Sequence, residues 1–217
     1  MTTGDLMREL WDSLQLGEIV LVERMDLKDQ YFGLHQLMSW GRSKGYTVLI
    51  VDVVDSFHIL TSKARLAGLD CECFDTTDVI KVGGRVKRGN VIAWISDLTE
   101  PVILIGKFKE AYERFLKENS PVLTIALGVE KLFVTSDVLP KSVHLALSLL
   151  SEYVGNRDRL TVHLIKAPLL GEEHRYLLNL IEDIATTIIR VSSHGRIGEF
   201  KVVKSIKRDA EGLTIRA

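Results

Sequence analysis

Hydrophobic positions along this chain switch repeatedly between two periods. Short, almost continuously apolar runs are typical of strands covered on both faces of a parallel sheet, and they occur at residues 18–24, 46–54, 121–127 and 159–165. Between them apolar residues recur every three or four positions, which predicts helices at about 3–14, 29–43, 57–67, 106–119, 139–154 and 171–185. This alternation favours an α/β protein with three layers, in which a largely parallel central sheet carries helices on both faces.

Two segments depart from the alternation. Residues 78–82 and 91–95 read as strands, and the intervening Gly83-Gly84 and Gly89-Asn90 predict tight turns and a protruding basic hairpin. At the end of the chain, residues 186–191, 199–205 and 213–216 predict three short strands in an antiparallel meander. With no linker or internal repeat, we expect a single domain over residues 1–217 that begins with the helix at 3–14.

The connection between the first strand and the second helix carries the most information about function. A strand, an eight-residue connection and a helix form the frame of the phosphate loop G-x-x-x-x-G-K-[ST]. On that frame Arg24 takes the first Gly, Asp29 the second, Gln30 the Lys and Tyr31 the Ser or Thr. Side chains with a Cβ resist the conformations that glycine adopts around phosphates, and the lysine charge and the small hydroxyl are missing. The sequence therefore argues against ATP hydrolysis.

The same connection supplies carboxylates where a phosphate would sit. Asp26 and Asp29 lie near the start of the helix, where either could cap free N–H groups and repel a triphosphate. Arg24 and Lys28 leave open the binding of some other anion. Asp52 and Asp55 follow the second strand, where two acids could serve a base or a metal, or instead cap a helix.

Composition narrows the classes of partner. The 217 residues are 46% hydrophobic and 26% charged, with a formal net charge of −1, so the whole chain has no attraction for nucleic acid or anionic lipid. No apolar run reaches the length that spans a bilayer, and we expect a cytoplasmic protein without a membrane partner. Three Gln and four Asn fit a thermophilic source.

One basic cluster stands out against that neutral background. It consists of Lys81, Arg85, Lys87 and Arg88 around the Gly-Gly turn, and it reads either as a solvated turn or as a contact for nucleic acid or protein. The six histidines are scattered and the two cysteines form a lone Cys71-Glu-Cys73 pair, so we expect no metal site and no cofactor.

The order of elements resembles the RecA-type ATPase core, especially its archaeal branch related to the circadian-clock kinase and the recombinase paralogues. The resemblance rests on residues 17–23, on 48–52 followed by 60–68, and on the C-terminal segments 180–185, 188–191 and 200–204. Residues 80–84 and 89–92 also resemble a small group of uncharacterised archaeal proteins of hyperthermophiles.

The resemblance implies a second departure from an active ATPase. The family's metal-binding acid should end the strand at about 121–128, but here the strand ends Ala126-Leu127-Gly128 and the first acid is Glu130. The family's catalytic glutamates follow its second strand, where this chain has Asp52 and Asp55. Both the phosphate loop and the metal-anchoring carboxylate of this RecA-like core therefore look degenerate.

Three hypotheses follow from the sequence. The first is a non-catalytic RecA-like domain, not an enzyme, that acts through a protein partner or assembles into a homo-oligomer. The second is a small-molecule or nucleotide-binding protein with a remodelled cleft at the carboxyl ends of the strands; its candidate residues are Arg24, Asp26, Lys28, Asp29, Asp52 and Asp55. The third is nucleic-acid binding through Lys81, Arg85, Lys87 and Arg88.

Overall fold

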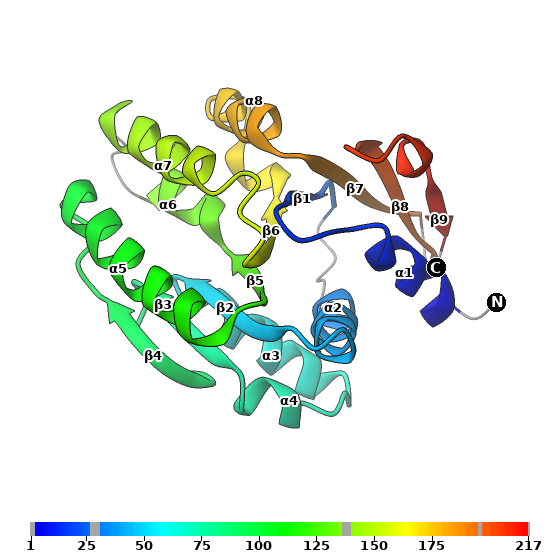
Figure 1. Ribbon diagram of the computed structural model, residues 1–217, viewed down its shortest axis with the longest axis horizontal. Helices are drawn as coiled ribbons and strands as arrows, with labels where there is room; N and C mark the ends of the chain where they lie inside the picture. The colour runs from blue at the N-terminus through cyan, green and yellow to red at the C-terminus, as the bar shows by residue number, and fades with distance from the viewer. Residues whose placement is uncertain (1–2, 27–30, 136–139, 195–196, 217) are drawn as a thin grey trace.

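A central β-sheet with helices packed against it organises the chain (Figure 1). The computed structural model describes residues 3–26, 31–135, 140–194 and 197–216. The strands are β1 (Ile19–Arg24), β2 (Thr47–Val53), β3 (Asp78–Val82), β4 (Asn90–Ile95), β5 (Val122–Leu127), β6 (Arg159–Lys166), β7 (Thr187–His194), β8 (Ile197–Lys204) and β9 (Thr214–Arg216). The α-helices are α1 (Thr3–Asp12), α2 (Tyr31–Ser43), α3 (Ser56–Leu66), α4 (Glu72–Asp75), α5 (Pro101–Asn119), α6 (Val129–Thr135), α7 (Pro140–Glu152) and α8 (Arg175–Ile184). Two short 3₁₀ helices are η1 (Ala167–Leu170) and η2 (Arg208–Ala210).

The order of strands differs from their order in the chain. Within the described residues the sheet runs β4-β3-β2-β5-β6-β1-β7-β8-β9. Every pairing from β4 to β7 is parallel, and β8 and β9 continue the sheet in antiparallel fashion. This confirms the predicted three-layer α/β architecture with its C-terminal meander. It also places the carboxyl ends of β2, β5, β6 and β1 side by side at one edge.

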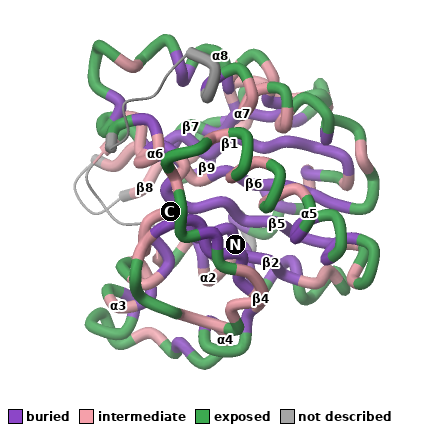
Figure 2. Tube along the Cα trace, turned by 90° about the vertical axis from the view of Figure 1, so that its left-hand side faces the viewer, coloured by how far each residue is buried: buried purple, intermediate pink, exposed green. Residues whose placement is uncertain are grey.

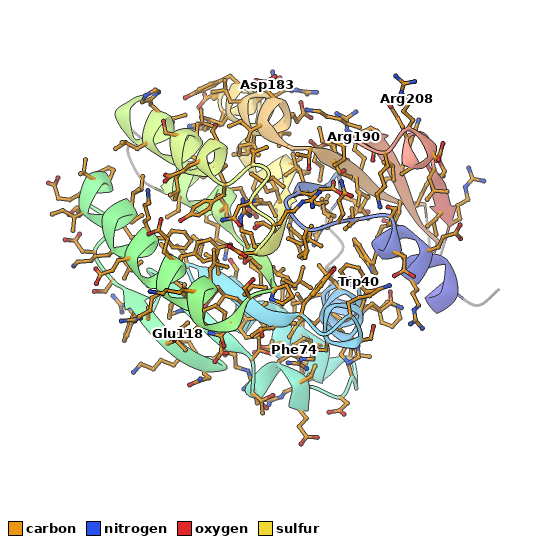
Figure 3. The ribbon with its side chains drawn as sticks, in the orientation of Figure 1. Trp40, Phe74, Glu118, Asp183, Arg190 and Arg208 are labelled. Atoms are coloured by element: carbon orange, nitrogen blue, oxygen red, sulfur yellow. The ribbon has the colours of Figure 1, made fainter. Side chains whose placement is uncertain are left out.

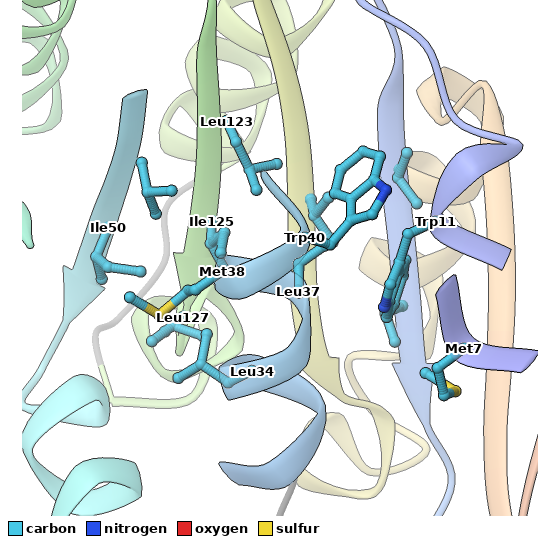
Figure 4. Close-up of a cluster of buried hydrophobic side chains, with 14 of the residues drawn as sticks. Met7, Trp11, Leu34, Leu37, Met38, Trp40, Ile50, Leu123, Ile125 and Leu127 are labelled. Atoms are coloured by element: carbon cyan, nitrogen blue, oxygen red, sulfur yellow. The ribbon is translucent and has the colours of Figure 1, made fainter. Parts of the chain in front are cut away.

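Helices cover both faces of the sheet (Figure 2). Successive residues of the central strands are therefore buried on opposite faces. On one face Leu34 and Met38 of α2 pack among Ile50, Ile125 and Leu127 of the strands (Figure 4). On the other face, α5, α7 and α8 supply the apolar partners. Among the described helices, none has the length and apolar character required to cross a membrane.

The predicted hairpin at residues 78–95 is wrong. β3 and β4 are adjacent but parallel, with Asp78 opposite Asn90 and Val82 opposite Ile95. Parallel neighbours usually need a crossover of a dozen or more residues, whereas only seven residues separate these strands. Sequence patterns at turns do not distinguish a reversal of the chain from a short return along the edge of a sheet. Here the connection between β3 and β4 is held by Asp55, which follows the end of β2.

The sequence did not predict α4, α6 or the 3₁₀ helices η1 and η2, and α5 is longer than expected. α5 begins at Pro101, five residues before the predicted start, and α6 occupies residues that the pattern left unassigned. Seven residues are too few to show a helical period clearly. α6 nevertheless fixes the position of the residues that follow β5, because Gly128 turns the chain from the end of β5 directly into this helix.

Candidate functional site

The acids after β2 are bonded to a lysine inside the protein. The side chain of Lys81 on β3 is fully buried (0% exposed), and its Nζ donates to Asp52 Oδ2 at 3.0 Å and to Asp55 Oδ1 at 2.5 Å. The second oxygen of Asp52 accepts the backbone N–H of Phe57 in the first turn of α3, at 2.8 Å. These contacts give Asp52 a capping and ion-pairing role.

Asp55 also holds the connection between β3 and β4. Its carboxylate accepts the backbone N–H of Arg85 at 2.9 Å and that of Val86 at 2.9 Å. Burial alone would raise the pKa of Asp55, but the hydrogen bonds from Lys81, Arg85 and Val86 outweigh it and lower the pKa to about 2. A Cβ at Gly84, where φ is +71°, would lie 2.6 Å from the Asp55 carboxyl carbon, so glycine is required beside this carboxylate.

The basic cluster seen in the sequence is divided among different contacts. Lys81 is enclosed with the two aspartates, and is therefore not available to a nucleic acid. Arg88 pairs with Asp75 at 2.7 Å, and the Lys87 ammonium lies 5.3 Å from the centre of the Trp94 ring. Arg85 is exposed on the connection. The four residues do not form one charged face.

A cleft lies at the carboxyl ends of β1, β5 and β6, where α3, α6 and η1 meet the sheet. It encloses about 180 Å³. Its charged lining comes from Arg24, Lys63, Glu130, Lys131 and Lys166. Open α/β sheets bind ligands at the carboxyl ends of their strands. The charged residues that line this cleft are four cations and one acid.

Strand register brings two of the cations together. Arg24 and Lys166 are the last residues of β1 and β6, and they are direct partners in the parallel ladder. Partners in a parallel ladder point to the same face, which here is the face of α3. The buried Arg24 also donates from Nε and Nη2 to the backbone carbonyl of Asp26, at 3.3 Å each. Arg24 thus occupies the strand end at which a phosphate loop would begin.

The acid of the cleft is a buried carboxylate on the first turn of α6. Glu130 is 5% exposed and its Oε2 has no hydrogen-bond partner among the described residues. Burial raises the pKa of Glu130, while the backbone N–H groups of Glu130 and Lys166 and the charges of Lys131 and Arg24 act in the opposite direction. Its neighbour Lys131 donates to the carbonyl of Val54 at 3.0 Å, and burial lowers the pKa of that lysine. The cleft therefore holds its charges in a partly desolvated setting.

The structure brings together only part of the predicted site. Arg24 lines the cleft. Asp26 forms an ion pair with Arg24, and its carboxylate accepts a hydrogen bond from the Ser193 hydroxyl. Asp52 and Asp55 are directed at Lys81 instead. Lys28 and Asp29 lie outside the described residues.

Sequence reasoning missed three cations of this cleft. Lys63 belongs to α3, Lys131 to the unpredicted α6, and Lys166 to the last position of β6, one residue beyond the predicted strand. The signal that could have found Lys131 and Lys166 is their place just after buried strands, because the ends of parallel strands share one edge.

A second ionic group lies on the opposite face at the same edge. Arg190 of β7, labelled in Figure 3, donates from Nε to Glu23 Oε2 at 2.8 Å and from Nη2 to Glu182 at 3.0 Å. Burial raises the pKa of Glu23 to about 7, assisted by the nearby Glu182 and opposed by Arg190. Among the residues with defined positions, no group of three or more His, Cys, Asp or Glu side chains could hold a metal ion.

Solved structures of archaeal proteins share this fold. A Pyrococcus horikoshii OT3 protein, studied under the project identifier PH0250, has a TM-score of 0.80 and 21% identity, covering 96% of this chain and 97% of that one. The KaiC-like protein PH0186 from the same organism has a TM-score of 0.63 and 12% identity over 93% of this chain and 85% of its own. The flagellar accessory protein FlaH from Methanocaldococcus jannaschii has a TM-score of 0.53 and 14% identity over 100% and 91%.

These similarities confirm the RecA-like fold, and at such low identity they show the fold alone. No curated protein matches the sequence significantly. A family model described as "Pyrococcus protein of unknown function, DUF257" matches residues 9–216, in accord with the resemblance to a group of archaeal proteins. Because the match spans nearly the full length, the chain belongs to the DUF257 family.

Proposed function

We propose that this protein is a non-hydrolytic RecA-like domain that binds a small anionic ligand in the cleft at the carboxyl ends of β1, β5 and β6. The observation that carries the proposal is the pairing of Arg24 and Lys166 in the strand register, with Lys63 and Lys131 lining the same cavity. Glu130 is the single acid among the described lining residues. Cations held in a partly desolvated cleft favour a compact anion such as a phosphate group.

The positions of the acids support the non-hydrolytic part of the proposal. Phosphoryl transfer needs a carboxylate to hold the metal and a group to orient the attacking nucleophile. The end of β5 carries the buried, apolar Leu127, and the acids after β2 bond to Lys81 and to backbone N–H groups. Leu127 lines the cleft but carries no carboxylate, and the two aspartates are directed at Lys81 instead.

Thermal unfolding with a series of anions tests the proposal. We expect pyrophosphate and ATP–Mg²⁺ to raise the unfolding temperature, because a ligand at one hundred times its Kd adds about 2.7 kcal/mol of stability. Lys166→Gln should remove most of that shift, and ATP should release no phosphate. Lys87→Gln removes a charge of the same sign outside the cleft and should keep the shift. An equal shift in both variants would refute the cleft as the binding site, and phosphate release that Lys166→Gln abolishes would refute the non-hydrolytic reading.

The negative charge of Glu130 allows a second test of anion binding in the cleft. A carboxylate beside a bound anion opposes it, so Glu130→Gln should tighten pyrophosphate binding severalfold at a pH where Glu130 is ionised. Because the pKa of Glu130 is raised, the affinity of the wild type relative to Glu130→Gln should increase as the pH falls toward that pKa and the carboxylate gains its proton. Isothermal titration across pH 5–8 measures both effects, and a variant that binds more weakly would contradict this role.

The exposed outer strand β4 favours a second candidate function, which is association with a protein partner or with another copy of the chain. β4 is the terminal strand, and Trp94 on it is 43% exposed. Val102 and Ile103 at the start of the neighbouring α5 are 69% and 51% exposed. An open strand edge with apolar side chains beside it is a site for pairing with another chain.

Sedimentation velocity at several concentrations tests this second candidate. If the edge joins two copies, Trp94→Lys should lower the sedimentation coefficient to that of a monomer. Leu66→Lys is the control, since Leu66 is 88% exposed on α3, away from the β4 edge. If the wild type sediments as a monomer at all concentrations, the hypothesis of self-association through this edge is rejected.

A further inference from the structure

A separate, partly open cavity lies between the sheet and the helices of the α5–α7–α8 face. Its volume is about 150 Å³. Leu104 and Phe108 of α5 and Leu147 and Leu150 of α7 contribute apolar walls. An apolar cavity of about this volume in another protein stays dry and binds benzene, so the space is sufficient for a small organic molecule.

The strand on one side of this cavity carries three polar side chains. Arg159, Thr161 and His163 alternate along β6 and therefore point to one face of the sheet. That face is covered by helices, and all three residues line the cavity. Beside them, the Thr124 and Tyr112 hydroxyls share a hydrogen bond of 2.8 Å. A strand buried on both faces normally carries apolar residues at such positions.

Arg159 is a buried cation without an anionic partner. It is 2% exposed, and no described carboxylate lies within ion-pairing distance of it. Its guanidinium donates to the Tyr153 carbonyl at 2.8 Å and to the Thr161 hydroxyl, and it lies 4.9 Å from the centre of the Tyr153 ring. The Nε of Arg159 is buried and has no acceptor. An uncompensated buried charge is costly, and burial lowers the pKa of this arginine.

His163 is a second unsatisfied polar group along the same strand. It is buried and its Nε2 has no partner among the described residues. Burial, with a smaller effect of the Arg159 charge, lowers the pKa of His163 to about 4, so the ring is neutral at pH 7. A neutral imidazole can donate one hydrogen bond and accept another. The cavity surface is thus almost entirely apolar, with Arg159 and His163 along one side of it.

We propose that this cavity is a binding site for a small apolar carboxylic acid, whose carboxylate pairs with Arg159 and whose aromatic or short aliphatic body fills the space between α5 and α7. The carboxylate supplies the counter-charge that the described protein groups do not, and an arginine–carboxylate pair is a strong charge-assisted hydrogen bond. The apolar walls exclude fully hydrated anions such as phosphate, which distinguishes this ligand from that of the cleft.

Arg159 lies far from the cations of the cleft at the strand ends. Arg159 begins β6 and Lys166 ends it, so the two are about 23 Å apart along the strand at 3.3 Å per residue. Variants in one site can therefore be tested without altering the other.

Binding of benzoate, hexanoate and the neutral analogue benzyl alcohol, measured by isothermal titration and by amide NMR shifts, tests the proposal. We expect benzoate or hexanoate to bind at least tenfold more tightly than benzyl alcohol, with NMR shifts at residues of β6, α5 and α7. Arg159→Met removes the charge and keeps an apolar side chain, and a buried charge replaced in this way often leaves stability unchanged or higher. This variant should lose at least tenfold in benzoate affinity and retain its affinity for benzyl alcohol.

Two further variants complete the design. Ala146→Leu adds bulk to the wall from α7 and should weaken benzoate and benzyl alcohol alike, while Lys166→Gln in the cleft should leave both unchanged. No binding of either acid, or equal affinity of the acids for wild type and Arg159→Met, would overturn the proposal. Loss of benzoate binding in Lys166→Gln alone would assign the acid to the cleft and likewise overturn it.

Discussion

A charged side chain buried inside this protein lowers stability unless it is paired and hydrogen-bonded. Lys81 meets that condition through Asp52 and Asp55. Lys81→Met should lower the free energy of unfolding by about 3–5 kcal/mol, since it leaves two carboxylates without their cation. Chemical denaturation measures the change.

Lys87→Met is the matched control for Lys81→Met. It makes the same change in charge and size, but Lys87 contributes only a cation–π contact with Trp94, worth about 0.5–1 kcal/mol at an exposed site. Equal losses in the two variants would show that the Lys81 cluster adds nothing specific to stability.

Glu23 predicts a pH dependence of stability. Its pKa is about 7 in the folded protein and 4.5 as a free side chain, so between these values the folded state holds a proton that the unfolded state has lost. The free energy of unfolding contributed by Glu23 should therefore fall as the pH rises from about 4.5 to about 7 and then level off. Glu23→Gln cannot titrate, so its stability relative to wild type should rise across that window in urea denaturation at each pH. A constant difference across the window would contradict the raised pKa.

At the scale of the element, one glycine decides how β5 continues into α6. Gly128 has a φ of +78°, and a Cβ there would lie 2.8 Å from the carbonyl oxygen of Val53 and closer still to Ser56 Oγ. Gly68 has the same φ of +78° with no atom within 4 Å of its Cβ position. Gly68→Ala should cost about 1–2 kcal/mol from the left-handed backbone alone.

Gly128→Ala should cost clearly more than Gly68→Ala, because the clash adds to the same backbone strain. It should also weaken anion binding at the cleft, since the turn places Glu130 and Lys131. Thermal unfolding and pyrophosphate titration of both variants measure these effects. Similar stability losses in the pair would mean that the β5–α6 turn relaxes around the added methyl group.

Elements with a clear apolar pattern were predictable from the sequence, including the short strands β3 and β9, whereas the short helix α6 was not. The buried runs that became β1, β2, β5 and β6 were recognised, because a strand inside a parallel sheet is apolar on both faces. α6 was missed because its seven residues are too short for a period. The predicted direction of β4 was wrong, and the connection before this strand is held by Asp55, thirty residues away along the chain, a contact that no local pattern contains.

At the scale of the whole molecule, the charge distribution argues against nucleic-acid binding. The net charge is −1, and the basic cluster around the Gly-Gly turn is split among a buried group and separate surface contacts. We expect fluorescence anisotropy with single-stranded DNA in 50 mM salt to show no binding beyond a weak, non-specific level. Tight binding that falls steeply with salt and is lost in Lys87→Ala/Arg88→Ala would overturn this expectation.

The sequence by itself determined the α/β class, the nearly parallel sheet and the absence of the phosphate-loop residues at Arg24 and Tyr31, because these depend on local periodicity and on the type of residue at fixed spacing. Only the tertiary structure decided which charged groups meet. The order β5-β6-β1 brings Arg24 beside Lys166, and the neighbouring β3 carries Lys81 to Asp52. Such pairings join residues far apart in the chain, so no local pattern contains them. The unpaired Arg159 was hidden for the same reason, since only the packing of helices over β6 encloses it.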